Sequence, residues 1–277
     1  MGMSAAWPIH GVDFTSVPRV RKPITVASGR FGDAAFWLDT FREFSAWPDF
    51  ESWLRCPGPW IAGFDFPFGL PREAVVDLGW PMQWAQLLAH CRAHGREEFR
   101  AALDRYREGR PVGKRYAHRA TDQPARSHSP LKLVNPPVGL MFLEGAPRLL
   151  DAGVAIPGLH AGDPQRVALE AYPGFSARQM VKASYKNDAP AKQTPGRKQA
   201  RASLLRSLQT RGNPFGFVLA GPQQLLRSLV DDGSGDRLDA VLCAMQAAWA
   251  YQRRDVNYGL PQEIDPIEGW IVMVPEK

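Results

Sequence analysis

Five acidic residues stand where short apolar runs end or where an apolar helix begins. Asp13 closes the run I-H-G-V-D, Asp65 closes W-I-A-G-F-D, and Glu170 closes R-V-A-L-E. Asp236 and Asp239 open the apolar segment G-D-R-L-D-A-V-L-C-A. Short apolar runs are typical of buried strands, and burying a carboxylate without a positive partner is costly. The pattern therefore predicts a cation that several of these acids share.

A divalent metal ion is the cation that these residue types favour. Mg²⁺ prefers oxygen ligands and is held by a few carboxylates together with water and substrate phosphate. Two such ions roughly 3.5–4 Å apart can activate water and stabilise the leaving oxygen of a phosphodiester. Scattered Asp and Glu without a Cys or His cluster is the signature of that chemistry. We therefore predict a hydrolase that uses Mg²⁺ or Mn²⁺.

Structural explanations of the same acids remain open. On a helix over residues 236–253, Asp239 falls at the edge of the apolar stripe and can face a sheet, whereas Asp236 points largely away from it. Asp236 equally suits a helix N-terminus, where an acid is stabilised by the helix dipole. Asp13 and Asp65 could each begin a turn. Their joint occurrence in matching contexts favours a shared site.

Positive charge is concentrated in one segment. The chain has a net charge of +6, and residues 178–211 carry nine Lys and Arg with a single acid, Asp188. The rest of the molecule is therefore close to neutral. A basic segment that follows a metal-binding carboxylate suits a nucleic-acid backbone, although a solvated helical face explains it equally well.

The order of the elements predicts an α/β protein with a mixed sheet flanked by helices. Apolar patterning predicts strands over residues 8–14, 24–32, 34–44, 60–66, 167–172 and 270–274. It predicts helices over residues 48–56, 72–107, 138–150, 174–181, 195–208, 221–230 and 236–253. We interpret residues 1–277 as a single domain with a helical and loop insertion over residues 72–162.

The segment 109–137 breaks the helical pattern. It is polar, rich in Pro and His and aperiodic, and loops of this length within a compact domain are often functional. His118, Arg119, Asp122 and His128 lie in it and could reach the acidic site, although such histidines are often simply solvated.

Composition points to a globular protein of a reducing compartment. Hydrophobic residues make up 44% and charged residues 22% of the 277 residues, which are ordinary globular values. No apolar run approaches the length of a membrane span, and the start M-G-M-S-A-A-W-P lacks the pattern of a signal peptide. Three widely separated cysteines suggest neither a disulfide framework nor a zinc site. We therefore expect a cytoplasmic protein with no membrane partner.

Four motifs together resemble an uncharacterised family of predicted RNase H-like nucleases. They are G-V-D-F-T-S, G-F-D-F-P-F-G-L-P, L-E-A-Y-P followed by K-Q-T-P-G-R-K-Q-A-R, and D-R-L-D-A-V-L-C-A-M-Q-A-A-W-A. The resemblance spans most of the chain and is weakest over residues 109–162. The D-x-x-D-A pattern of the last helix is also similar to Holliday-junction resolvases.

The resemblance implies a ribonuclease H-like fold and metal-dependent cleavage of nucleic acid. In such a fold the first strand supplies the acid that bridges the metal ions, which maps to Asp13. The acid of the fourth strand maps to Asp65, the helix acids map to Asp239 and Asp236, and Glu170 would be an auxiliary catalytic acid. Phosphates would be held by the basic residues of the helix after L-E-A-Y-P, namely Lys192, Arg197, Lys198 and Arg201.

Two other functions compete with this interpretation. Sugar kinases and actin-like ATPases share the broad fold and carry an acid–Gly–Thr/Ser phosphate loop after the first strand. Here Phe14 stands where glycine would let the phosphates approach. A second alternative is a nucleic-acid-binding protein that keeps the fold without turnover.

Overall fold

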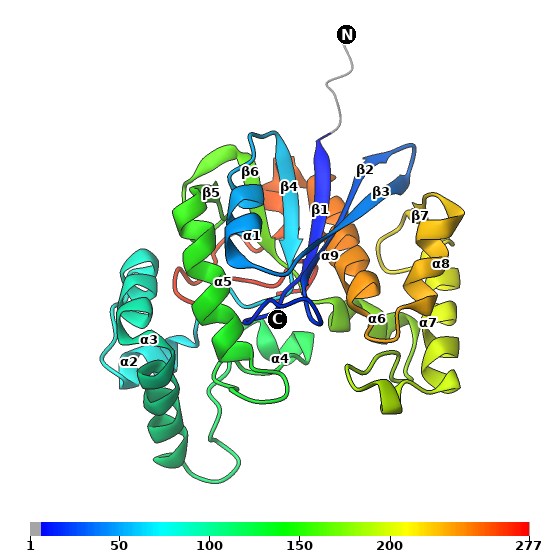
Figure 1. The fold of residues 1–277 in the computed structure, drawn as a ribbon. Coiled ribbons are helices and arrows are strands. Elements are labelled where there is room, and N and C mark those ends of the chain that lie inside the picture. The colour runs from blue at the N-terminus through cyan, green and yellow to red at the C-terminus, as the bar shows by residue number, and fades with distance from the viewer. Residues whose placement is uncertain (1–6, 277) are drawn as a thin grey trace.

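A seven-stranded mixed sheet forms the centre of the computed structural model, which describes residues 7–276 (Figure 1). Residues 1–6, on which the expected absence of a signal peptide partly depends, lie outside the described residues. The strands are β1 (Pro8–Asp13), β2 (Ile24–Gly32), β3 (Ala35–Phe44), β4 (Trp60–Phe64), β5 (Val154–Ala155), β6 (Asp163–Glu170) and β7 (Val218–Ala220). Their order across the sheet is β5-β6-β4-β1-β2-β3-β7. The predicted α/β class with a mixed, helix-flanked sheet is confirmed.

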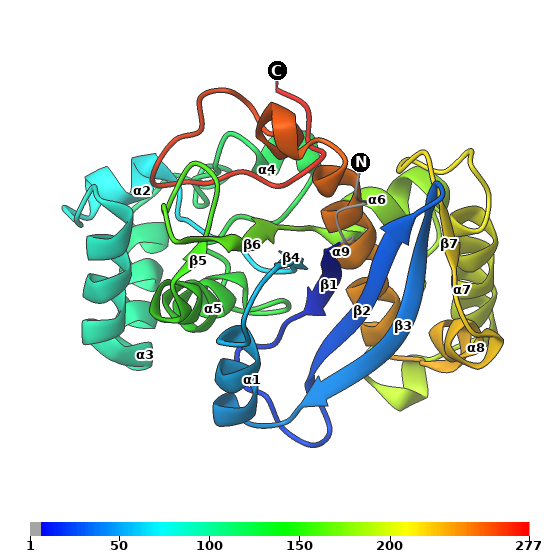
Figure 2. The ribbon, with the colours of Figure 1, turned by 90° about the horizontal axis from the view of Figure 1, so that it is seen from above.

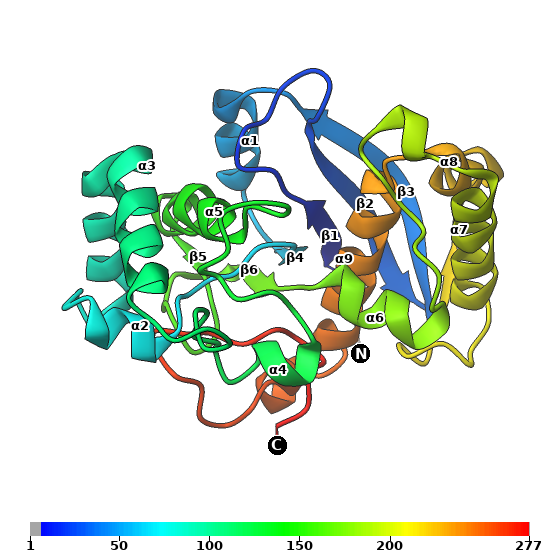
Figure 3. The ribbon, with the colours of Figure 1, turned by 90° about the horizontal axis from the view of Figure 1, so that it is seen from below.

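The strand directions bring Asp13, Asp65 and Glu170 to the same end of three neighbouring strands. β1, β2 and β3 form an antiparallel meander, whereas β4 runs parallel to β1 and β6 runs parallel to β4. In register, Val12 lies opposite Phe64, and Phe64 lies opposite Glu170. The carboxyl ends of β1, β4 and β6 therefore meet, and Figure 3 views the sheet from this side.

Helices cover both faces of the sheet (Figure 2). They are α1 (Trp47–Leu54), α2 (Arg72–Asp77), α3 (Trp84–Glu108), α4 (Asp122–Ala125), α5 (Val138–Ala152), α6 (Pro173–Met180), α7 (Pro195–Leu208), α8 (Gln223–Asp231) and α9 (Asp236–Tyr251), with 3₁₀ turns η1 (Pro190–Lys192) and η2 (Arg254–Gly259). One hydrophobic cluster joins α1, α3 and α5 to one face of the sheet. A second cluster joins α7, α8 and α9 to the other face.

Helix α9 touches the backbone of the sheet because two glycines leave room for it. A Cβ atom placed on Gly11 of β1 would lie 2.0 Å from the carbonyl oxygen of Ala240 and from the amide nitrogen of Ala244. A Cβ atom on Gly63 of β4 would lie 2.5 Å from the carbonyl oxygen of Cys243. Real Cβ atoms do not approach backbone atoms so closely, so only glycine fits at either position. Glycine inside a strand is often a mark of such close approach.

The region 72–162 shares its core with the sheet. Buried Leu87 of α3 and Phe142 of α5 belong to the same hydrophobic cluster as Val26 of β2 and Phe64 of β4. Because this cluster is continuous, α3, which packs on α5, and α5 itself share one core with the sheet.

Most predicted elements are confirmed, and β2 and α7 have the predicted bounds. The predicted helix over residues 72–107 is instead two helices, and α3 is kinked at Gly95, where φ is 68°. The predicted strand over residues 270–274 is wrong, because within the described residues this segment makes only a single bridge, from Ile271 to Glu170. The short strands β5 and β7 and the one-turn helix α4 escaped prediction, since two to four residues give no periodic signal.

Replacing Gly11 by alanine is expected to destabilise the protein by about 1–3 kcal/mol or more, because α9 must shift off the sheet to admit a methyl group. Gly32→Ala is the matched control, since a Cβ atom there meets nothing within 4 Å and should change stability by less than about 0.5 kcal/mol. Urea unfolding followed by circular dichroism measures both. Equal midpoints for the two variants would contradict the close packing of α9.

Candidate metal centre

Three aspartates from three elements converge beside the carboxyl ends of β1 and β4. Asp13 ends β1, Asp65 follows β4, and Asp239 lies in the first turn of α9. One carboxylate oxygen from each lies within 4.8 Å of the other two. Backbone bonds fix the geometry: the amide of Asp65 donates to the carbonyl of Val12 (2.9 Å), and the amide of Asp239 donates to that of Gly235 (2.9 Å). The oxygens are close enough for one cation to contact all three.

The three carboxylates differ in their access to solvent. Asp13 and Asp239 are buried, whereas Asp65 is partly exposed. Burial, followed by the nearby charge of Asp236, raises the pKa of Asp13 well above its usual range. Burial also raises the pKa of Asp65 to about 7. Burial therefore disfavours the charged forms of these two carboxyl groups, and a cation beside them would favour the charged forms.

Two side chains of the segment joining α6 to α7 bind the buried carboxylate of Asp239. The Tyr185 hydroxyl donates to Oδ1 of Asp239 (2.6 Å), and the Lys186 ammonium forms an ion pair with Oδ2. Burial opposes the charge on Lys186, but Asp239, Asp13 and Asp65 outweigh it and hold the pKa of the lysine well above its usual range. Sequence reasoning counted Lys186 only as part of a basic segment, because nothing in its spacing points to α9.

A second lysine lies beside the cluster. The Lys22 ammonium donates to Oδ1 of Asp236 (2.7 Å) and to Oδ1 of Asp188 (2.8 Å). Asp236 is the first residue of α9, after Gly235 at the N-cap, and its side chain is 10% exposed. The charge of Asp236 contributes to the raised pKa of Asp13, but its carboxylate lies outside the three-aspartate cluster. Lys22 belongs to the motif R-V-R-K-P, which gave no indication of a site.

Glu170 makes a different set of contacts. Its two carboxylate oxygens accept from the Arg119 guanidinium at 2.6 and 2.7 Å, and Oε2 also accepts from the amide of Phe68 (2.9 Å). The structure thus places Glu170 in a buried ion pair at the end of β6 and not among the three aspartates. Its carboxylate fixes the turn that follows Asp65.

The candidate residues of the long loop separate into two groups. Arg119 and Asp122 are almost fully buried, and Asp122 accepts from the guanidinium of Arg119 (2.9 Å). Together with Glu170 they form one network that ties the loop to the sheet. His118 and His128 are both exposed, and His128 contacts Lys132 at 3.1 Å.

The four basic residues expected to hold phosphates differ in their burial. Arg201 is buried and donates to the carbonyl oxygens of Val230 (2.9 Å) and Tyr185 (2.7 Å). Its guanidinium therefore holds the segment that carries Tyr185. The other three lie nearer the surface: Lys198 pairs with Asp231 (2.7 Å), Arg197 bonds Ser184 and the carbonyl of Lys192, and Lys192 is exposed.

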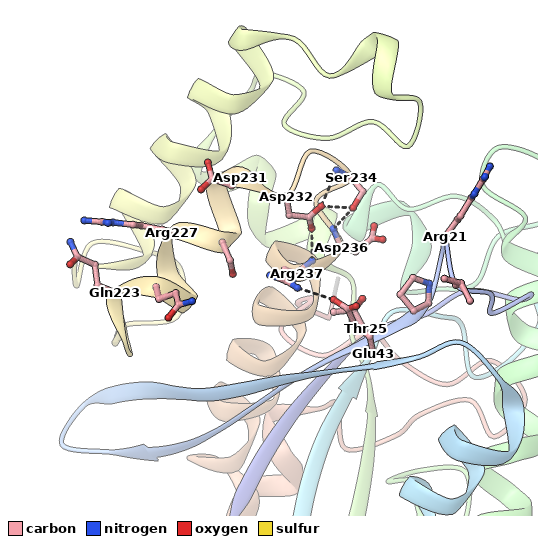
Figure 4. Close-up of a pocket in the computed structure, with 14 residues that line it drawn as sticks. Arg21, Thr25, Glu43, Gln223, Arg227, Asp231, Asp232, Ser234, Asp236 and Arg237 are labelled. Atoms are coloured by element: carbon pink, nitrogen blue, oxygen red, sulfur yellow. Dashed lines mark hydrogen bonds and ion pairs between the residues drawn. The ribbon is translucent and has the colours of Figure 1, made fainter.

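A groove of about 800 Å³ has Asp236 in its wall (Figure 4). It lies between the start of β2, the end of β3, α8 and the start of α9. Exposed Arg21 and Arg227 line it, and Arg237 in the same wall is paired with Glu43 (3.0 Å). The wall thus mixes arginines with acids, since Asp231 and Asp232 also line it. Asp236 is the lining residue whose charge acts on Asp13.

Comparison with known proteins places the chain in a family. A family model described as protein of unknown function (DUF429) matches residues 11–263, and the chain belongs to this family. The match includes all three aspartates of the cluster. No curated protein and no solved structure matches the chain.

Two further observations concern membrane-spanning helices and cysteines. Within residues 7–276, none of the helices combines the length and apolar character that crossing a membrane requires. Cys56, Cys91 and Cys243 are free thiols, and the last two are buried.

Divalent cations are expected to raise the melting temperature much more at about pH 8 than at about pH 5.5. Asp65, with a pKa of about 7, keeps its proton in the folded protein over a pH range in which the unfolded chain has lost it, and the raised pKa of Asp13 acts in the same direction. Without metal, the stability therefore falls as pH rises from about 4 toward 7. A bound cation requires the deprotonated carboxylates and therefore reverses this loss at high pH.

Differential scanning fluorimetry with and without Mn²⁺ measures the effect, and Asp65→Asn should reduce its pH dependence. A Mn²⁺ shift of the same size at both pH values would argue against these carboxylates as ligands.

Proposed function

We propose that this protein is a ribonuclease H-like nuclease that hydrolyses phosphodiester bonds of a nucleic acid with Mg²⁺ or Mn²⁺. The observation that carries the proposal is the convergence of Asp13, Asp65 and Asp239 within 4.8 Å. Carboxylate oxygens are the ligands that these hard ions prefer, and the donor set contains no thiolate or imidazole. The residues present therefore suit Mg²⁺ or Mn²⁺ better than zinc.

The placement of the acids supports the proposed fold. The RNase H-like resemblance implies acids on the first strand, the fourth strand and the last helix, and Asp13, Asp65 and Asp239 occupy the ends of β1, β4 and the start of α9. We also propose that residues 1–277 form one domain in which residues 72–162 are an insertion.

The acidic side chains of the site would have different roles. Asp13, Asp65 and Asp239 would hold the ion, and Asp236 would add a carboxylate on the side of Lys22. When bound, the metal supplies an activated water and neutralises the charge that develops on the phosphate. Asp65 is the partly exposed member of the three, so water would reach the ion beside it. Glu170 would act as a positioning residue, because it holds the amide of Phe68 in the turn after Asp65.

The nucleic acid would approach along the groove and α7. Arg21 and Arg227 line the groove that leads to Asp236, and Lys192 and Arg197 lie near the surface on the segment that adjoins the cluster. Phosphate contacts of this kind position a strand without reading its sequence. Arg201 is buried against carbonyl oxygens, so its contribution would be to hold Tyr185.

The contacts of Phe14 favour hydrolysis over phosphotransfer. Phe14 follows Asp13, is buried, and packs on Phe66 with ring centroids 4.5 Å apart. A phosphate loop at this position would need free backbone amides and glycine, and the aromatic cluster fills that space instead. We further propose that the protein works in the reducing cytoplasm, which suits its three free thiols.

Asp13→Asn is expected to abolish metal-dependent cleavage, with a loss of about 100-fold or more, because it removes a charged ligand common to the cluster. The measurement is cleavage of labelled single-stranded, duplex, hybrid and branched nucleic acids with Mn²⁺ or Mg²⁺. Asp39→Asn is the matched control, since Asp39 lies on the exposed side of β3 and pairs with Arg30. If no substrate is cut, or if the Asp13 variant cuts as well as the native chain, the nuclease function is wrong.

Arg227→Ala is expected to weaken nucleic-acid binding several-fold and to reduce its salt dependence, while kcat changes little. Removing one side chain that binds a phosphate lowers the slope of log affinity against log salt by about one. Fluorescence anisotropy over a salt series measures both quantities. Arg92→Ala is the control, because Arg92 is also exposed but pairs with Asp151 away from the groove. Identical salt slopes for the two variants would rule out the groove as the binding path.

A further inference from the structure

Lys186 combines an accessible side chain with a buried ion pair. The side chain is 42% exposed, whereas that of its partner Asp239 is 0% exposed. The lysine stem therefore reaches in from the surface, and its ammonium supplies the positive charge that the three aspartates need. A long, exposed side chain can leave such a contact without opening the hydrophobic core.

The backbone around Lys186 is held independently of the ammonium. The buried guanidinium of Arg201 binds the carbonyl of Tyr185 (2.7 Å), and the amide of Asn187 donates to the carbonyl of Gly233 (3.3 Å). Gly235, with φ of 80°, brings the start of α9 close to Lys186, where a Cβ atom would lie 2.6 Å from the Cβ of the lysine. These contacts keep Lys186 beside the cluster even when its side chain turns away.

The ammonium and a divalent ion compete for the same carboxylate. Lys186 pairs with Oδ2 of Asp239, and Asp239 is one of the three aspartates that can hold a metal. An ammonium and a divalent ion on the same carboxylate repel each other, so binding of one weakens binding of the other. A metal with twice the charge is bound more strongly by three carboxylates than one ammonium is, so it displaces the lysine.

We propose that Lys186 has two roles at this site, an inference that rests on the proposed nuclease function. Without metal, its ammonium is the counter-ion of the three aspartates. When a divalent cation displaces it, the ammonium turns to the substrate side and binds a non-bridging oxygen of the scissile phosphate. Lys186 thereby links metal loading to phosphate binding and is a catalytic residue. It takes no part in bond making or proton transfer.

The test is the substitution Lys186→Met, which removes the charge and keeps an apolar stem. The matched control is Lys182→Met, because Lys182 lies four residues earlier in the same segment and is exposed. Calorimetry measures Mn²⁺ affinity without substrate and then the affinity of the Mn²⁺-saturated protein for a nucleoside 5′-monophosphate. Single-turnover cleavage at saturating Mn²⁺ is the third measurement.

The two roles predict changes in opposite directions. Lys186→Met should bind Mn²⁺ about tenfold more tightly, since it loses a competing cation. Its Mn²⁺-saturated form should bind the monophosphate several-fold more weakly and cleave about 100-fold more slowly, as expected for loss of one charged donor to the phosphate. Lys182→Met should match the native protein throughout.

Unchanged or weaker Mn²⁺ binding by Lys186→Met, with a native melting temperature, would overturn the proposal. Tighter Mn²⁺ binding with unchanged monophosphate affinity would also overturn it, because the phosphate role is then absent. If Lys186→Met fails to fold, Lys186→Gln replaces it in the same measurements. Failure of the native chain to cleave any substrate would refute the nuclease function alone, since both binding measurements still decide the role of Lys186.

Discussion

The contact between α9 and the backbone of β1 and β4 is the constraint on which the site depends. Gly11 and Gly63 allow this contact, and a side chain at either position would push the helix away. Asp239 directly precedes Ala240, the residue whose carbonyl lies against Gly11. The position of the buried carboxylate is therefore set by backbone packing, which is much stiffer than a side-chain rotamer.

This packing has an electrostatic consequence. It brings Asp239 to Asp13 and Asp65 in a largely buried place, where burial raises the pKa of Asp13 and of Asp65. Two lysines offset the cost of burying these negative charges: Lys186 pairs with Asp239, and Lys22 pairs with Asp236. Both lysines come from connecting segments and not from the sheet. The rigid core thus supplies the negative charge, and the more adaptable segments supply the positive charge.

The sequence predicted the acids better than their partners. Asp13 and Asp65 were identifiable because each ends an apolar run, and Asp239 because it opens an apolar helix; both are local signals. Glu170 has the same local signal, but its pairing with Arg119 joins residues 51 positions apart and is invisible to periodicity. Lys186 belongs to a basic run whose members look alike in sequence. The predicted strand over residues 270–274 is wrong because a strand needs a partner strand, and apolar character alone does not reveal one.

The network around Arg119 explains why a long polar loop is packed against the end of the sheet. One guanidinium lies between Asp122 and Glu170, and the carbonyl of Glu268 also accepts from it (3.0 Å). Two buried carboxylates against one cation leave a net negative charge. Burial is the main cause of the raised pKa of Asp65, and the charge of Glu170 makes a smaller contribution to it. The loop therefore does more than connect helices. It fixes Glu170 at the end of β6, where the carboxylate also binds the amide of Phe68 in the turn after Asp65.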